Sequence, residues 1–166
     1  MKLNILVEEK SWNEFDLNFM GSKALELALL SIHINSLNYE YSILACDNNR
    51  ITDLNYKFRE KKFPTDILSW PEFDLKNAKP GLYPKSPPIS ENAEALIDLG
   101  NIAIAYEACF NELENTNINH YDHLMHLLLH GCLHLLGFDH QDSSDASLME
   151  SIEISSLSSL GISNPY

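Results

Sequence analysis

The sequence predicts an α+β fold, a compact single domain with a small mixed β-sheet and about four to five helices. Its 166 residues, of which 45% are hydrophobic and 21% charged, suit one domain with its own core. Segments with the two-residue period of strands and segments with helical spacing follow one another along the chain. The expected order is strand, helix, strand, helix, strand, strand, helix, helix, which favours an α+β domain with a mixed sheet.

The N-terminal part is expected to form a strand, a helix and a second strand. Residues 2–8 alternate and are β-prone, and residues 39–46 also have the composition of a strand. Between them, residues 20–36 have helical spacing. Four apolar side chains there fall on one helical face: Leu25, Ala28, Leu29 and Ile32.

A turn and a short helix are expected next. The dipeptide Asn48-Asn49 is typical of a turn, either a hairpin-like connection or a connection from strand to helix. Thr52 is expected to cap a helix that carries Arg59 and ends before Pro64.

The middle of the chain is expected to contain two strands separated by a long loop. Residues 65–70 predict a strand that ends at Pro71, because proline cannot donate to a sheet. Residues 71–95 hold five of the seven prolines and predict a surface loop. Residues 96–106 alternate well enough to form a strand, and the polar residues 111–119 predict a turn.

Two helices are expected at the C-terminal end. Residues 121–136 are strongly apolar and predict a helix that Gly137 ends. Asp142 or Ser144 is expected to cap a last helix that runs to about Leu160.

Positive charge is concentrated in one part of the chain. The net charge of −13 argues against a general nucleic-acid coat protein. Eight of the 11 Lys and Arg residues lie between Arg50 and Lys85, and they are densest at residues 55–62. This segment is either a solvated helix end or a surface that faces phosphate.

The composition also indicates the cellular compartment in which the protein is expected. The three cysteines form no CxxC pair, which argues against a disulfide framework and favours a reducing compartment. No apolar run approaches the roughly 18 residues of a membrane span. The first residues resemble a strand more than a signal peptide. We therefore expect a cytoplasmic protein without a membrane partner.

The motif HxxxHxxGxxH at residues 130–140 predicts a metal site. On a helix, His130 and His134 are about 40° apart around the axis and about 6 Å apart along it, so both can reach one ion. Gly137 lets the chain turn so that His140 can become the third ligand. Three nitrogen ligands with an open fourth position are typical of catalytic zinc. The alternative is a histidine-rich helix face without metal.

Other residues around the motif have weaker claims. Cys132 points about 160° away from His134 on a helix, so it is not expected to be a ligand. Asp139 either supports a ligand or caps the turn. Gly131 stands where HExxH proteases have their general base, which counts against a peptidase. His120, His123 and His126 are expected to be ordinary buried or surface histidines. The alternative is that His123 or His126, which share the helical face of His130, supports a metal ligand.

Several segments resemble the YbeY family, a bacterial group of metal-dependent endoribonucleases and ribosomal RNA maturation factors. HGCLHLLGFDH, residues 130–140, is similar to the family signature at every fixed position. Residues 54–70 resemble the family's LN…R…TDVLSF block, and residues 99–105 resemble its LGDI strand. Met149 and Glu153 resemble the M…E of its last helix. Together the matches cover roughly residues 40–161.

The resemblance implies a fold in which the metal-binding helix is central and the site opens into a cleft. It implies that His130, His134 and His140 hold one zinc ion, and that His130 and Arg59 are catalytic, with Arg59 acting on RNA phosphate. It also implies a single-strand-specific endoribonuclease for ribosomal RNA processing (16S 3′ end maturation) and ribosome quality control. Ribosomal RNA is the implied substrate, and ribosomal proteins or a ribosome-associated GTPase are further partners.

The chain differs from the family pattern at two places, and two alternative functions stay open. Asn101 replaces the aspartate of the LGDI strand, and the proline-rich insertion around residues 76–95 is longer than usual. The spacing of the histidines leaves a zinc peptidase-like hydrolase as one alternative. A non-catalytic ribosome assembly factor, in which zinc only orders the site, is the other.

Overall fold

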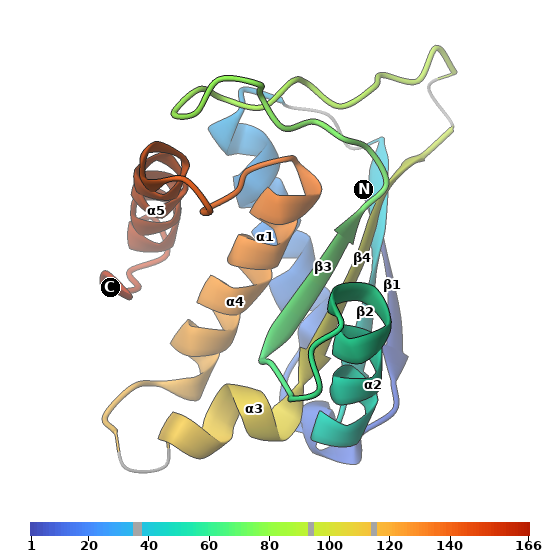
Figure 1. Cartoon of the computed structure of the whole chain (residues 1–166), viewed down its shortest axis with the longest axis vertical. Coiled ribbons are helices and arrows are strands. Elements are labelled where there is room, and N and C mark those ends of the chain that lie inside the picture. Colours follow the sequence, from blue (N-terminus) through green and yellow to red (C-terminus); the bar gives the residue numbers. More distant parts are fainter. Residues whose placement is uncertain (35–37, 93–94, 114–115) are drawn as a thin grey trace.

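A four-stranded mixed sheet forms the centre of the computed structural model, which describes residues 1–166 except 35–37, 93–94 and 114–115 (Figure 1). The strands lie in the order β1-β2-β4-β3. β1, β2 and β4 run parallel, and β3 pairs antiparallel with β4 at one edge. Their bounds are β1 (Lys2–Val7), β2 (Tyr39–Cys46), β3 (Ile67–Pro71) and β4 (Ile97–Ala105). The prediction of an α+β fold with a small mixed sheet is confirmed, and each predicted strand is present within two residues of its expected ends.

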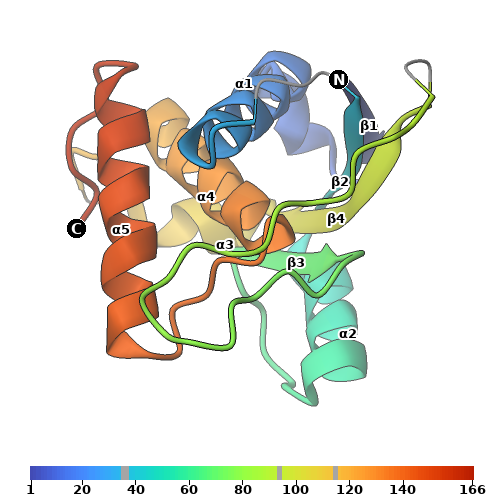
Figure 2. The same cartoon turned by 90° about the horizontal axis from the view of Figure 1, so that it is seen from above.

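Five α-helices and two short 3₁₀ turns complete the described part of the chain. α1 and α4 cover one face of the sheet, α2 covers the other, and α5 packs outside α4 (Figures 1 and 2). None of the described helices is long and apolar enough to cross a membrane. The bounds are η1 (Lys10–Glu14), α1 (Leu17–Ser31), α2 (Asn48–Arg59), α3 (Tyr106–Phe110), η2 (Asn111–Leu113), α4 (His120–Leu135) and α5 (Ser143–Ser158).

The chain passes from β2 to α2 at Asn48-Asn49, as the second alternative had it, but both residues are already in the first turn of α2 and not in a turn before it. Asp47 is the N-cap, and its carboxylate accepts a hydrogen bond from the backbone N–H of Arg50 at 2.7 Å. Thr52, predicted as the cap, donates its hydroxyl to the carbonyl of Asn48 inside the helix. The backbone N–H of Asn48, which has no partner within the helix, donates to Glu107 Oε2 at 3.0 Å.

Other element ends also differ from the predictions. α1 begins three residues early because Asp16 caps it, and its predicted end at residue 36 lies outside the described residues. α3 was not expected, and η2 occupies the start of the predicted turn at 111–119. β3 was expected to stop before Pro71, but it includes Pro71 as its last residue, which pairs with Gly100 at the sheet edge. Asp142 is the cap of α5, as one of the two expectations had it.

α4 is the central helix of the fold, as expected. It lies between the sheet and α5, and nine of its residues are buried. Gly131 is on the face of α4 that packs against β3 and β4. A Cβ atom at this position would lie 2.8 Å from the Cδ1 atoms of Ile67 and Ile102. The glycine therefore lets the helix approach the sheet closely, which is a packing reason for its presence.

Candidate metal centre

Three histidine rings meet at the C-terminal end of α4. His130 and His134 come from the helix itself, one turn apart, and His140 follows the turn at Gly137, whose φ is 89°. One ring nitrogen from each lies within 4.8 Å of the other two. The structure therefore brings together the three residues that the motif predicted.

The hydrogen bonds of the two helical histidines determine which nitrogen of each ring carries a proton. His130 Nδ1 lies 2.8 Å from Glu153 Oε1, and His134 Nδ1 lies 2.9 Å from the carbonyl oxygen of Phe138. Both oxygens are acceptors, so both Nδ1 atoms are donors and each neutral ring keeps a lone pair on Nε2. The two Nε2 atoms are 3.0 Å apart. Two lone pairs at this distance repel each other unless a cation lies beside them, so the donor set suits a metal ion.

His134 is held in the neutral form that a ligand requires. Burial is the main cause, and the neighbouring His130 adds to it; together they lower the pKa of His134 to about 4. At neutral pH the ring is therefore uncharged, and metal binding there does not have to displace a proton from it.

Glu153 is a fully buried carboxylate on α5 behind His130. Burial alone would raise its pKa, but contacts with His126, His130 and Tyr166 outweigh burial and lower the pKa to about 2. Oε1 accepts from His130, and Oε2 accepts from the hydroxyl of Tyr166. His126 Nε2 lies 3.8 Å from Oε2. The carboxylate therefore stays ionised and orients the His130 ring.

Glu153→Gln is expected to weaken metal binding about 10-fold to 100-fold, because an amide can no longer accept from His130 with a full negative charge. Tyr166→Phe is expected to act in the same direction with a smaller effect, since it removes only one of the bonds to Glu153. Competition with a chromogenic zinc chelator measures both affinities. Glu91→Gln, at an exposed position in the proline-rich segment, changes the net charge equally and is the control. An equal loss of affinity in this variant would mean that bulk charge, not orientation, sets the affinity.

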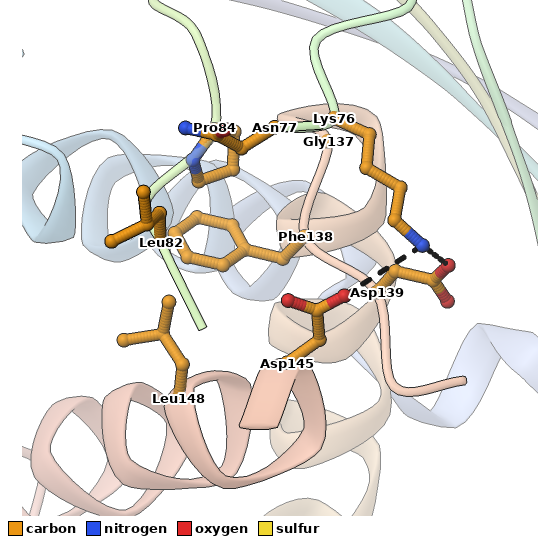
Figure 3. Close-up of a pocket in the computed structure, with 9 residues that line it drawn as sticks. All are labelled: Lys76, Asn77, Leu82, Pro84, Gly137, Phe138, Asp139, Asp145 and Leu148. Carbon is orange, nitrogen blue, oxygen red and sulfur yellow. Dashed lines mark hydrogen bonds and ion pairs between the residues drawn. The ribbon is translucent and has the colours of Figure 1, made fainter. Parts of the chain in front are cut away.

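The proline-rich segment contacts the turn that carries His140 through Lys76 and so stabilises the position of this turn (Figure 3). Lys76 Nζ lies 2.5 Å from Asp139 Oδ2 and 3.7 Å from Asp145 Oδ2. The hydrogen bond to Asp139 raises the pKa of Lys76. Asp139 Oδ1 also accepts from the backbone N–H of His140. Asp139 thus caps the turn and binds the loop, and no hydrogen bond joins it to a histidine ring within the described residues.

An open cleft of about 940 Å³ runs past the three histidines. β3 forms one wall of the cleft. Arg59, the last residue of α2, also lines the cleft, although α2 and α4 lie on opposite faces of the sheet. Among the described residues Arg59 has no ion-pair partner, and its side chain is exposed. The basic residue and the histidine cluster that the sequence singled out therefore share one cleft.

Comparison of the sequence with known proteins identifies the family. The family model described as Endoribonuclease YbeY matches residues 4–161. The chain belongs to the YbeY family. Relatives named Endoribonuclease YbeY include those from Ruegeria pomeroyi, 40% identical, and Ruegeria sp., 39% identical; the alignments cover 100% of this chain and 98% and 96% of those proteins.

A solved structure shares the fold. The solution structure of a Thermotoga maritima protein superposes with a TM-score of 0.56 at 20% identity, over 99% of this chain and 94% of that one. This likeness concerns the fold alone.

The YbeY pattern has an aspartate where this chain has Asn101, and the structure locates that position away from the histidines. Asn101 is exposed on β4 and lines a separate groove of about 590 Å³ on the outer face of the sheet, beside Arg50 and Leu54. The substitution therefore removes no carboxylate from the cleft of the candidate metal centre.

Three of the remaining candidates near the motif, His120, His123 and Cys132, have packing roles. His120 stacks on Phe110 at 4.7 Å between ring centroids, and His123 meets the same ring edge-on at 6.5 Å. Cys132 is fully buried in the core, and burial raises its pKa to about 12, so it is not prepared to bind a metal. His126 differs from these, because it lines the cleft beside Glu153.

Met149 and Tyr166 lie beside the histidines, which the spacing of residues in the sequence does not show. Met149 is buried in α5 and lines a pocket of about 270 Å³ beneath His130 and His140. It belongs to α5, as its resemblance to the M…E of the last helix in the YbeY pattern implies. Tyr166 has no local pattern around it; its contact with Glu153 depends on how the segment after α5 folds back.

Proposed function

We propose that the protein is a zinc-dependent endoribonuclease that cleaves single-stranded segments of ribosomal RNA during processing, including 16S 3′ end maturation and quality control. The observation that carries the proposal is the common cleft of the histidine cluster and Arg59. The names of the relatives, Endoribonuclease YbeY, support the reaction class. We further propose that residues 1–166 act as one functional unit in the cytoplasm, with ribosomal proteins or a ribosome-associated GTPase as additional partners.

His130, His134 and His140 would hold one zinc ion through their ring nitrogens, with the side toward the cleft left open. A bound ion would polarise a phosphate oxygen and lower the pKa of a water molecule. Glu153 lies buried behind His130 and keeps the lone pair of that ring pointed at the site. Because Glu153 does not reach the cleft surface, we assign it orientation and not proton abstraction.

Arg59 would bind the scissile phosphate. A guanidinium can contact two phosphate oxygens at once and stabilise the charge that develops on them during cleavage. Its exposure at the cleft wall leaves it free to do so, and its position in the basic end of α2 suits an anionic chain. A phosphodiester therefore matches this cleft better than a peptide does.

Cleavage of a ribosomal RNA fragment with a single-stranded 3′ tail tests the proposal. We expect chelator to abolish cleavage, added zinc to restore it, and Arg59→Ala to reduce kcat/KM by roughly 100-fold to 1,000-fold. Arg50→Ala is the matched control, because Arg50 is on the same helix, pairs with Glu8 and lines the other groove. Cleavage that is unchanged by both chelator and Arg59→Ala would show that this cleft is not the source of the activity.

A further inference from the structure

The end of α2 and the residues after it combine cations with exposed aromatic rings. Tyr56, Phe58 and Phe63 are 52%, 52% and 55% exposed, although large aromatic side chains are usually buried. Within the same eight residues lie four cations: Lys57, Arg59, Lys61 and Lys62. We call residues 56–63 the aromatic–basic segment.

The cations of this segment are available to a ligand. None of the four forms an ion pair with another described residue, and Glu60 is the one acidic residue among them. In a chain of net charge −13, this concentration of unpaired positive charge favours an anionic partner.

The aromatic rings are also available. Three ammonium groups lie over them at 4.9–5.8 Å: Lys62 over Tyr56, Lys57 over Phe58 and Lys61 over Phe63. Such exposed contacts contribute little, and a nucleic-acid base that stacks on a ring interacts more strongly. A base can therefore replace a lysine over a ring, and the released ammonium can reach the adjoining phosphate.

Backbone contacts hold the segment in place. Glu60 ends α2 in the left-handed conformation, with its N–H bonded to the carbonyl of Tyr56. The buried Asn55 donates its side-chain amide to the carbonyl of Phe63 at 2.8 Å, which ties the chain after the helix back onto it. The rings are therefore presented by a fixed turn, which reduces the entropy lost on binding.

We propose that the aromatic–basic segment is a binding site for single-stranded RNA, in which bases stack on Tyr56 and Phe63 while Lys57, Lys61 and Lys62 contact phosphates. The inference rests on the proposed function and extends it. α2 lies on the face of the sheet opposite α1 and α4 (Figure 2). Phe58 and Arg59 line the cleft of the histidines, so an RNA strand bound on α2 leads directly to that cleft. Duplex RNA is excluded from this mode because its bases are already stacked.

Fluorescence anisotropy with the full chain tests the site, using a short labelled single-stranded RNA in the cold before cleavage accumulates. We expect Tyr56→Ala with Phe63→Ala to weaken binding at least about 10-fold, with the slope of log affinity against log salt unchanged. Lys61→Ala with Lys62→Ala should instead make that slope shallower by about 1.4. Phe19→Ala, which removes an equally exposed ring from α1, should have no effect.

An abasic strand of equal length separates stacking from charge. Wild-type protein should bind it as weakly as the double aromatic variant binds normal RNA, and that variant should not distinguish the two strands. Equal binding by the aromatic variant and wild type would overturn the inference while wild-type cleavage still supported the proposed function. If a polyglutamate peptide bound the segment and RNA neither bound nor was cleaved, both would fail.

Discussion

Gly131→Glu is expected to unfold the protein, not to convert it into a zinc peptidase. The change restores the HExxH pattern in the sequence, but the position faces Ile67 and Ile102 across a gap that one Cβ atom already overfills. Overpacking costs about 1–3 kcal/mol, and an unpaired carboxylate buried against the sheet costs several more. This approaches the whole stability of an ordinary domain, about 5–15 kcal/mol.

Thermal and urea unfolding followed by circular dichroism would measure this loss. Gly131→Ala should cost much less, because the atoms it meets are the movable ends of two isoleucines and alanine favours a helix by about 1 kcal/mol over glycine. Ser151→Glu on the exposed face of α5 adds the same charge and should be nearly neutral. A folded Gly131→Glu protein that hydrolyses peptides would show that close packing of α4 on the sheet is not the reason for this glycine.

His134→Ala is expected to remove metal binding and RNA cleavage together. An apparent binding free energy of about 10–16 kcal/mol for zinc with four protein ligands corresponds to roughly 3 kcal/mol per ligand, so the loss of one imidazole should weaken binding at least about 100-fold. Cleavage should then fall to background at metal concentrations that saturate the wild type. Metal content per chain and cleavage of the same RNA fragment measure the two effects.

His120→Ala is the control for this variant, since it removes an imidazole from the same helix at a position that only stacks on Phe110. It should keep both metal and activity. Complementation of cells that lack the protein separates catalysis from a role in ribosome assembly. If the His134→Ala variant folds, binds ribosomes and fully replaces the wild type in these cells, the protein acts as an assembly factor and not as a nuclease.

Features encoded by neighbouring residues could be predicted from the sequence. The apolar run before Gly137 predicts α4, and the four-residue spacing of His130 and His134 predicts that their rings meet. Asn48-Asn49 was misread because the same side chains suit a turn and a helix start, and only the cap at Asp47 decides between them. Local pattern is therefore reliable for the middle of an element and weak at its ends.

Features that depend on distant residues could not be predicted in this way. The bond from Tyr166 to Glu153 requires α5 and the segment after it to be in place, and no periodicity signals it. Gly131 looked like an absent general base because the sequence does not show how closely α4 approaches the sheet. In both cases the reason lies in packing between elements, which becomes visible only in the folded chain.

The contacts that assemble the histidine cluster span very different lengths of chain, and this bears on the order in which it forms. His130 and His134 are 4 residues apart, His130 and Glu153 are 23 apart, and Lys76 and Asp139 are 63 apart. Closing a longer loop costs more chain entropy, so the helical pair is the easiest to form and the docking of Lys76 the hardest. The position of His140 thus depends on the contact with the largest closure cost, and a change at residue 76 can alter it without touching any ligand.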